Sequence, residues 1–230
     1  IDVVLHNAIN GGRRNKIDDV KIVYDNILMF ENIVKNNLLD LNTITIQNVN
    51  TNIFYEEDKE KLEQTELPYG RSALEPVLSK TNIDNHYGKL YKGYVDRFNK
   101  GEGDPAFNRA GAYLHDIWFR QLRAPKNANA PYGASLALIN QHFGTFIDFK
   151  KTMKEEAMKI QGSGWIYLTR SGKISTIKNH TIRHDIALLI DWWEHSWALD
   201  YQSDKVSYLK NIWRCVNWDA VNRVLTGDET

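Results

Sequence analysis

The order of residue patterns along the chain predicts an α+β fold: helices come first, a small antiparallel sheet follows, and further helices close the sequence. Two observations carry this prediction. Residues 67–125 read as two helices joined by a short turn, and residues 165–190 hold three short apolar segments of strand length. The expected architecture is a helical hairpin followed by a domain with a three-stranded sheet.

Residues 1–66 differ in composition from the rest and form a predicted N-terminal extension. They are polar, but apolar side chains recur at helical spacing between residues 17 and 39, which predicts an amphipathic helix there. Residues 42–52 alternate loosely, as a short strand or an extended strap does. The charge run at 56–66 is most simply interpreted as a solvated linker.

The predicted hairpin domain, residues 67–125, contains a capping-box pattern from Thr81 to Asp84, followed by an apolar stripe at helical spacing. The segment 101–105 holds two glycines and a proline and breaks the helix sharply. A second helix is predicted over 106–122. So short a connection favours an antiparallel pair of helices.

The predicted C-terminal domain, residues 126–230, changes from helices to strands and back. A turn from Arg170 to Lys173 joins the first two strands, and the continuous apolar run of the third strand favours a buried position. The predicted helices cover about 134–142, 146–160, 205–214 and 217–225, and the predicted strands cover 165–169, 173–178 and 186–190.

Composition excludes several classes of protein. The chain has 29 basic and 29 acidic residues, so no overall positive field attracts it to nucleic acid. No apolar run approaches the roughly 20 residues that span a bilayer, and no signal peptide is visible. The single cysteine, Cys215, rules out an intramolecular disulfide, and its Trp-rich helical setting favours buried packing over a reactive thiol. We expect a soluble protein without nucleic-acid or membrane partners.

Two histidines on the predicted hairpin are candidate metal ligands. His86 shares a helix face with Leu90 and Tyr94, four and eight residues further on. His115 lies one turn after Gly111 on the second helix. A glycine inside a helix costs about 1 kcal/mol relative to alanine. Either it leaves space for a group from elsewhere or it allows close helix–helix contact, and the residues alone leave both explanations open.

A second pair of candidate ligands follows the third strand, in the segment Asp191-Trp-Trp-Glu-His195. An aspartate and a histidine at a strand end, flanked by tryptophans, predict a dry pocket with two ligands. Three imidazoles and one carboxylate suit iron or manganese, which accept mixed nitrogen and oxygen ligands. They suit zinc less distinctively, and a lone cysteine disfavours metals that prefer thiolates.

Residues 67–225 resemble the iron/manganese superoxide dismutase family almost end to end. Each motif alone is weak, but all of them occur in the family's order and all four ligand positions are kept. The motifs are Leu67-Pro-Tyr, His86-Tyr-Gly-Lys89, Phe107-Asn108 through His115, Phe143-Gly-Thr-Phe, Gly162-Ser-Gly-Trp165, Asp191-Trp-Trp-Glu-His195, Leu199-Asp-Tyr201 and Val216-Asn-Trp218.

The resemblance implies that the hairpin packs on the C-terminal domain, with one iron or manganese ion held between them. The implied ligands are His86, His115, Asp191 and His195, two from each domain. The implied reaction disproportionates superoxide to dioxygen and hydrogen peroxide. Tyr94 matches the family's gateway tyrosine, and Trp165 and Trp192 match apolar walls of the site.

Glu194 matches a family glutamate that reaches the ligand histidine of a second subunit, which implies a homodimer; a plain surface glutamate is the alternative. The short turn 101–105 also favours a dimer over a tetramer. Leu90 and Ala198 replace a gateway histidine and the tyrosine that contacts it across the dimer, so the substrate funnel is expected to be altered.

The family also supplies a glutamine amide to the metal-bound solvent from one of two positions, and here these positions hold Gly111 and His180. We expect His180 to fill the space above Gly111 and to contact that solvent; the alternative leaves it exposed in the loop 178–185. An imidazole can titrate near neutral pH, unlike an amide. This pairing gives a slight preference for iron or for the use of either metal.

The extension 1–66 matches nothing in the family's pattern. It is expected to be a docking arm for a larger assembly, a strap over the enzyme domain, or a processed remnant. The sequence begins with Ile1 rather than Met, and together with such an arm this would suit packaging in a particle such as a virion. Without such packaging, a cytoplasmic location is expected. Two rival functions remain: a catalytically weak or inactive structural module on the same fold, and a metal oxidoreductase that cleaves carbon–carbon bonds with dioxygen.

Overall fold

The structure of the protein is a computed structural model that describes residues 61–228. The helix predicted at 17–39, the strand or strap predicted at 42–52 and the first part of the predicted linker lie outside these described residues. Within the described part, no helix is long and apolar enough to cross a membrane.

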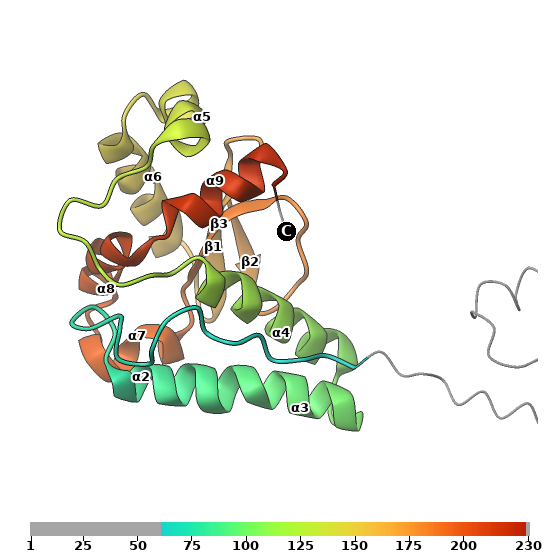
Figure 1. Cartoon of the computed structure of the whole chain (residues 1–230). Coiled ribbons are helices and arrows are strands. Elements are labelled where there is room, and N and C mark those ends of the chain that lie inside the picture. Colours follow the sequence, from blue (N-terminus) through green and yellow to red (C-terminus); the bar gives the residue numbers. More distant parts are fainter. Residues whose placement is uncertain (1–60, 229–230) are drawn as a thin grey trace, which may run out of the picture. The chain divides into compact units, whose positions relative to one another are not determined.

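The first half of the described chain is the predicted helical hairpin, whose two arms lie side by side (Figure 1). Gly101 ends the first arm in the left-handed conformation, with φ of 71°. Asp104 caps the second arm, which has a proline in its first turn. The first arm comprises α2 (Lys80–Asn85), the π-helix η2 (His86–Tyr91) and α3 (Lys92–Lys100), and the second arm is α4 (Pro105–Arg120).

The first arm begins earlier than the capping-box pattern predicts. Ser79, rather than Thr81, is the capping residue, and its hydroxyl oxygen accepts a hydrogen bond from the backbone N–H of Asn82 at 3.1 Å. The start of this helix was therefore wrong by two residues, although its existence is confirmed.

The first arm is also not a regular α-helix, because residues 86–91 form a π-helix. Its wider turn changes which side chains share a face, and such turns are frequent at functional sites. Tyr91 is buried with its ring stacked on that of His115, at 5.8 Å between centroids, whereas Leu90 is half-buried. The extra residue in the turn is thus used to place an aromatic ring beside the second helix.

The second half contains the three-stranded antiparallel sheet in the order β2-β1-β3, which confirms the predicted fold class. The strands are those predicted, within one residue at each end. The short helix α7 was not predicted as a helix. The elements are α5 (Gly133–Phe143), α6 (Phe146–Met158), β1 (Gly164–Thr169), β2 (Ile174–Lys178), β3 (Ile186–Asp191), α7 (Glu194–Tyr201), α8 (Lys205–Ile212), the 3₁₀ turn η3 (Trp213–Cys215) and α9 (Trp218–Thr226).

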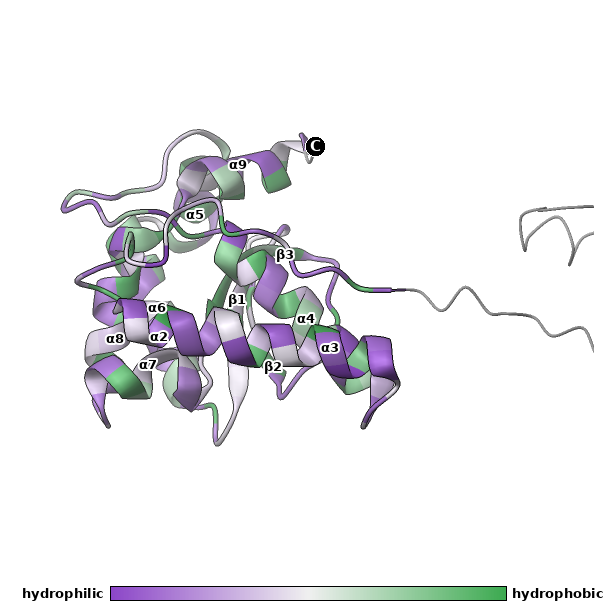
Figure 2. Ribbon diagram, turned by 60° about the horizontal axis from the view of Figure 1, so that its bottom comes forward, coloured by the Kyte–Doolittle hydropathy of each residue, from purple (hydrophilic) through white to green (hydrophobic). Residues whose placement is uncertain are grey.

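The core lies around β1 and β3, which are buried along their whole length. In Figure 2 much of the outward side of α2 and α3 is hydrophilic. A strand buried on both faces loses the alternation of polar and apolar residues, which is why the sequence shows a continuous apolar run. Cys215 is buried, as predicted, and burial raises the pKa of its thiol to about 12.

Residues 61–66 run along the hairpin and are hydrogen-bonded to it, although most of them are exposed, as expected of a solvated linker. The backbone of Leu62 forms two hydrogen bonds with the side chain of Asn99, both at 2.8 Å. The carbonyl of Thr65 accepts a hydrogen bond from the Tyr87 hydroxyl at 2.8 Å, and its N–H donates to the Tyr91 hydroxyl at 3.3 Å. The packed unit therefore begins before residue 67.

Gln121, at the end of α4, joins the hairpin to the edge of the sheet. Its side-chain amide donates to the carbonyl of Ala187 at 2.9 Å, and its amide oxygen accepts from the N–H of Leu189 at 2.8 Å. Both backbone groups belong to β3, which pairs with β1 on its other side. The buried glutamine thus takes the place of a neighbouring strand, and the bond fixes α4 relative to β3.

We predict that Gln121→Ala lowers the free energy of unfolding by about 2–4 kcal/mol, because two buried backbone groups lose their partner at about 1–3 kcal/mol each. Urea denaturation monitored by tryptophan fluorescence measures this. Gln141→Ala, at an exposed position of α5, is the matched control and should change stability by about 0.5 kcal/mol or less. Equal effects of the two substitutions would show that Gln121 does not couple the hairpin to the sheet.

Candidate metal centre

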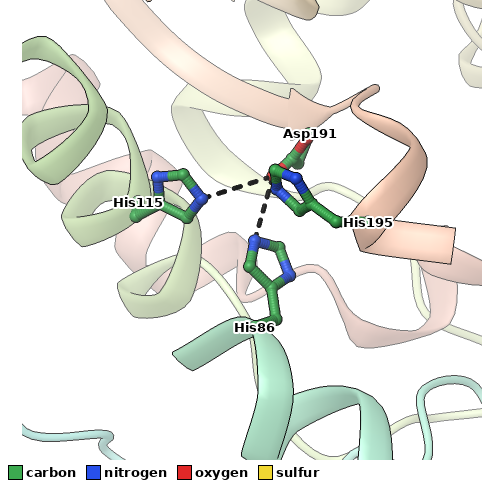
Figure 3. Close-up of side chains that lie close together, drawn as sticks. All are labelled: His86, His115, Asp191 and His195. Atoms are coloured by element: carbon green, nitrogen blue, oxygen red, sulfur yellow. Dashed lines mark ion pairs between the residues drawn. The ribbon is translucent and has the colours of Figure 1, made fainter. Parts of the chain in front are cut away.

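The four predicted ligands come together between the hairpin and the sheet (Figure 3). His86 is the first residue of the π-helix and His115 lies on α4, so the hairpin supplies two of them. Asp191 is the last residue of β3 and His195 lies on α7. One ligand atom from each residue lies within 4.8 Å of all the others.

The cluster is organised around one carboxylate oxygen, Asp191 Oδ2. It lies 3.1 Å from His86 Nε2, 3.4 Å from His195 Nε2 and 3.8 Å from His115 Nε2. His86, His115 and Asp191 are fully buried, and His195 retains 17% of its side-chain exposure. The centre is therefore almost closed to solvent.

Hydrogen bonds outside the cluster determine which atoms face its middle. The Nδ1–H of His115 donates to the carbonyl of Gly111 at 2.6 Å, which leaves the Nε2 lone pair pointing inward. Asp191 Oδ1 accepts from the backbone N–H of Trp193 at 2.8 Å, which leaves Oδ2 for the centre. The ligand atoms are thus oriented by their neighbours.

These inward atoms are acceptors that face one another without a hydrogen bond. Asp191 Oδ2 and the Nε2 atoms of His86, His115 and His195 are all buried polar atoms without a hydrogen-bond partner. Buried polar atoms are normally paired, and each unpaired one costs about 1–3 kcal/mol. A cation among them would satisfy all four atoms at once, and a set of three imidazoles and one carboxylate fits iron or manganese.

Electrostatics keep the ligands in the protonation states that bind metal. Burial lowers the pKa of His86 and lowers that of His115 further, so both imidazoles are neutral with free lone pairs. Burial acts to raise the pKa of Asp191, but its electrostatic interactions with His195 and with His86 hold it below its ordinary value. Asp191 is therefore an ionised carboxylate.

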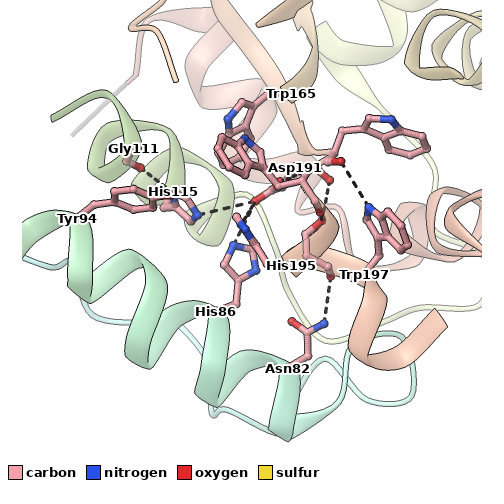
Figure 4. A network of polar contacts seen from close by, with 12 residues as sticks. Asn82, His86, Tyr94, Gly111, His115, Trp165, Asp191, His195 and Trp197 are labelled. Carbon is pink, nitrogen blue, oxygen red and sulfur yellow. Dashed lines mark hydrogen bonds and ion pairs between the residues drawn. The ribbon is translucent and has the colours of Figure 1, made fainter. Parts of the chain in front are cut away.

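The backbone around the ligands is tied to both halves of the chain (Figure 4). The carbonyl of Asp191 accepts hydrogen bonds from the hydroxyls of Tyr208 at 2.8 Å and Ser196 at 3.1 Å. The side-chain amide of Asn82, on the hairpin, donates to the carbonyl of Ser196 at 3.1 Å. This links α2 to α7 beside the cluster, so the hairpin and the C-terminal ligands are held in one frame.

Comparison with known proteins gives the same result as the geometry. Residues 61–104 match the alpha-hairpin domain of the iron/manganese superoxide dismutases, and residues 131–224 match their C-terminal domain. The chain belongs to the iron/manganese superoxide dismutase family.

Its relatives cover both metals. The superoxide dismutase (Fe) of Bacteroides fragilis is 35% identical, over 71% of this chain and 98% of that protein. The superoxide dismutase (Fe) of Sulfolobus acidocaldarius is 36% identical, over 72% and 93%. The superoxide dismutase (Mn/Fe) of Porphyromonas gingivalis is 35% identical, over 67% and 94%.

Aromatic rings line this superoxide dismutase centre, but not all of them are those predicted. Trp165 is buried with its ring edge-on to His115, at 5.1 Å between centroids. Trp192, predicted as the second wall, instead packs near Tyr208. Trp193 faces the site, with its ring stacked near that of His195 at 5.4 Å. Trp193 is two residues away from each of the C-terminal ligands. Side chains alternate in direction along the segment after β3, and this brings Trp193, rather than Trp192, to the metal side.

Tyr94, His180 and Trp165 form a chain of hydrogen bonds. The indole Nε1–H of Trp165 can only donate, so the His180 Nδ1 that lies 3.2 Å away accepts. The proton of this imidazole is therefore on Nε2, which donates to the Tyr94 hydroxyl oxygen at 2.9 Å. The Tyr94 hydroxyl is therefore the acceptor in this hydrogen bond, and its own proton can be donated to a group other than His180.

The alternative of an exposed His180 is wrong, because its side chain is buried and stacks on Trp193 at 4.4 Å between centroids. Burial lowers the pKa of His180 to about 4, so the imidazole is neutral at neutral pH. The expectation that His180 could titrate near neutral pH is therefore wrong. Burial raises the pKa of the Tyr94 hydroxyl to about 12, so it keeps its proton.

The space beside Gly111 is taken by Tyr94, not by His180 as predicted. A Cβ atom at Gly111 would lie 2.8–3.1 Å from three ring atoms of Tyr94, closer than van der Waals contact allows. The glycine inside α4 thus leaves space for a ring from α3, and the same residue provides the carbonyl that orients His115. His180 reaches this region only through its hydrogen bond to Tyr94.

Proposed function

We propose that this chain is a superoxide dismutase that converts superoxide to dioxygen and hydrogen peroxide. The observation that carries the proposal is the set of four buried acceptor atoms that one cation would satisfy together. The proposed metal ligands are His86, His115, Asp191 and His195. When bound, an iron or manganese ion supplies one-electron chemistry, by which one superoxide is oxidised and a second is reduced.

Iron or manganese is supported by the ligand atoms and by the relatives. Three imidazole nitrogens and one carboxylate oxygen suit either ion. Two of the relatives named above carry iron in their names and the third carries both metals. We infer one ion in each chain, with a slight preference for iron.

The roles of the chain's own residues follow from the hydrogen bonds. Neutral His180 donates to the Tyr94 oxygen and so holds the hydroxyl with its proton turned away from the imidazole. We infer that Tyr94 donates this proton on the side of the metal centre, where its ring lies 5.3 Å from that of His115. Trp165 and Trp193 exclude water around the ligands.

A purely structural module on this fold is less well supported. Without an ion, the fold would bury four acceptor atoms without partners. Each would cost about 1–3 kcal/mol and gain nothing in return. The dioxygen-dependent rival uses two histidines and one carboxylate, so the third imidazole here has no role in it.

We also propose a homodimer formed through α7. Glu194 is exposed at the start of this helix, directly before the ligand His195. Leu199, on the same helix, is 55% exposed and adds an apolar side chain to this surface. A second copy that covers this surface would also cover the remaining exposed part of His195. The docking arm and the particle were proposed for the extension 1–66, of which residues 1–60 lie outside the described residues, and both stay predictions.

We predict that the metal-free protein is inactive. Loading it with at least one of the two metals, iron or manganese, should restore superoxide dismutation. His86→Ala should lose stoichiometric metal and all activity, because the centre keeps only three ligands. His142→Ala, an exposed histidine on α5, should keep both. Metal analysis and the dismutation assay are made on the same samples. Full metal occupancy without activity would contradict the proposed function and favour the structural module.

For His180, we predict that His180→Phe lowers kcat about tenfold or more, because loss of a supporting hydrogen bond around a metal centre typically costs 10–100-fold. His180→Gln should recover part of the loss, since its amide can still donate to Tyr94. His184→Phe, in the same loop but exposed, is the control. If His180→Phe and His180→Gln both match the parent in activity, metal preference and pH profile, His180 has no such role.

For the proposed dimer, sedimentation equilibrium should give a mass of about twice 26.7 kDa. Leu199→Asp should shift the equilibrium toward monomer, because it places a charge in the apolar part of the contact. Met158→Asp, at a 45% exposed position of α6, should leave the mass unchanged. A parent protein that sediments as a monomer at every concentration would exclude the interface.

A further inference from the structure

Superoxide is an anion, yet the chain offers it no overall attraction, since its 29 basic and 29 acidic residues cancel. Positive charge near the route of approach to the metal centre would attract it locally. One arginine lies where such a charge would act. This inference rests on the proposed function and concerns how the substrate reaches the same site.

Arg97 lies on α3 one turn after Tyr94, and its guanidinium carbon is 4.9 Å from the centroid of the Tyr94 ring. The backbone makes room for it: a Cβ atom at Gly93 would come within 3.0 Å of Arg97 Nη1. A larger residue at position 93 would make the guanidinium shift by a few tenths of an ångström.

A buried amide on the second arm holds the same guanidinium. Asn108, on α4, is only 2% exposed, and its Oδ1 accepts from Arg97 Nε at 3.1 Å. Its Nδ2 donates to the carbonyl of Glu102 at 2.8 Å, which fixes the orientation of the amide. An arginine held by a buried partner loses less rotamer freedom than a free surface side chain.

These contacts place Arg97 on the outward side of the gateway. The ring of His115 lies 5.3 Å from that of Tyr94, and Tyr94 is 7% exposed while Arg97 is exposed. From the metal centre outward the order is therefore ligand, tyrosine, arginine, solvent. Among the described residues, Asp96 pairs with Lys92, and none of the ion pairs involves Arg97.

We propose that Arg97 is a positioning residue that attracts superoxide to the Tyr94 side of the metal centre. The cation lies beside the ring that closes the centre, and its field is focused by the apolar surroundings of Tyr94 and Phe107. The same contact has a purely structural explanation, in which the guanidinium merely stabilises the Tyr94 ring by a cation–π interaction. The two explanations predict different effects of ionic strength on the rate and different effects of the Arg97→Lys substitution.

The test compares Arg97→Gln, Arg97→Lys and the parent, all metal-loaded, by pulse radiolysis at ionic strengths from about 10 mM to about 0.5 M, where the Debye length falls from about 30 Å to below 5 Å. Arg223→Gln, at an exposed position of α9, controls for loss of one positive charge elsewhere. Calorimetric titration with azide, a small anion, measures anion affinity without turnover. Urea denaturation of each variant measures stability.

Steering predicts that Arg97→Gln lowers kcat/KM about three- to tenfold at low salt, with kcat unchanged, and that the difference vanishes at high salt. The azide affinity of Arg97→Gln should fall by a similar factor. Arg97→Lys should keep most of the parent's kcat/KM at low salt and most of its azide affinity. A parent-like salt dependence in Arg97→Gln would overturn the proposal. So would equal losses in Arg97→Lys and Arg97→Gln that persist at high salt, since they indicate a structural role. An inactive parent would instead refute the proposed function, and azide binding would still decide this inference.

Discussion

The buried charge of Asp191 is the constraint on which the rest of the structure depends. A carboxylate without solvent is costly unless positive charge or hydrogen bonds surround it. Here the last residue of β3 carries it into the centre of the protein, and three imidazoles turn their acceptor nitrogens toward it. The hydrogen bonds that Asp191 accepts from the backbone N–H of Trp193 and from the hydroxyls of Tyr208 and Ser196 position this residue. The frame therefore holds together four atoms that repel one another until a cation lies between them.

The fold class and the four ligands could be predicted because they depend on residue type and spacing. Continuous apolar runs show that β3 is buried, and the glycines and proline of 101–105 show where the hairpin turns. Both signals are local. The ligands stand out because histidines and an aspartate occur in apolar or aromatic settings where they have no ordinary structural role.

The remaining features depend on contacts between distant segments. No local pattern distinguishes the π-helix from a regular helix, because its wider turn is stabilised by packing of Tyr91 on His115. The choice between Trp192 and Trp193 depends on how the chain leaves β3. Tyr94, and not His180, occupies the space beside Gly111 because α3 lies against α4 at that point. Sequence could show that the glycine leaves space, but only the structure shows what fills it.

The hairpin and the C-terminal half each contribute two ligands, and three of the four are fully buried. Because the centre is almost closed, we expect an ion to leave or enter mainly when these halves separate, which requires breaking the bonds of Gln121 to β3 and of Asn82 to α7. Exchange should then be limited by local unfolding rather than by the intrinsic affinity of the ligands. We therefore expect the metal content of the mature enzyme to record the metal supply at the time of its synthesis.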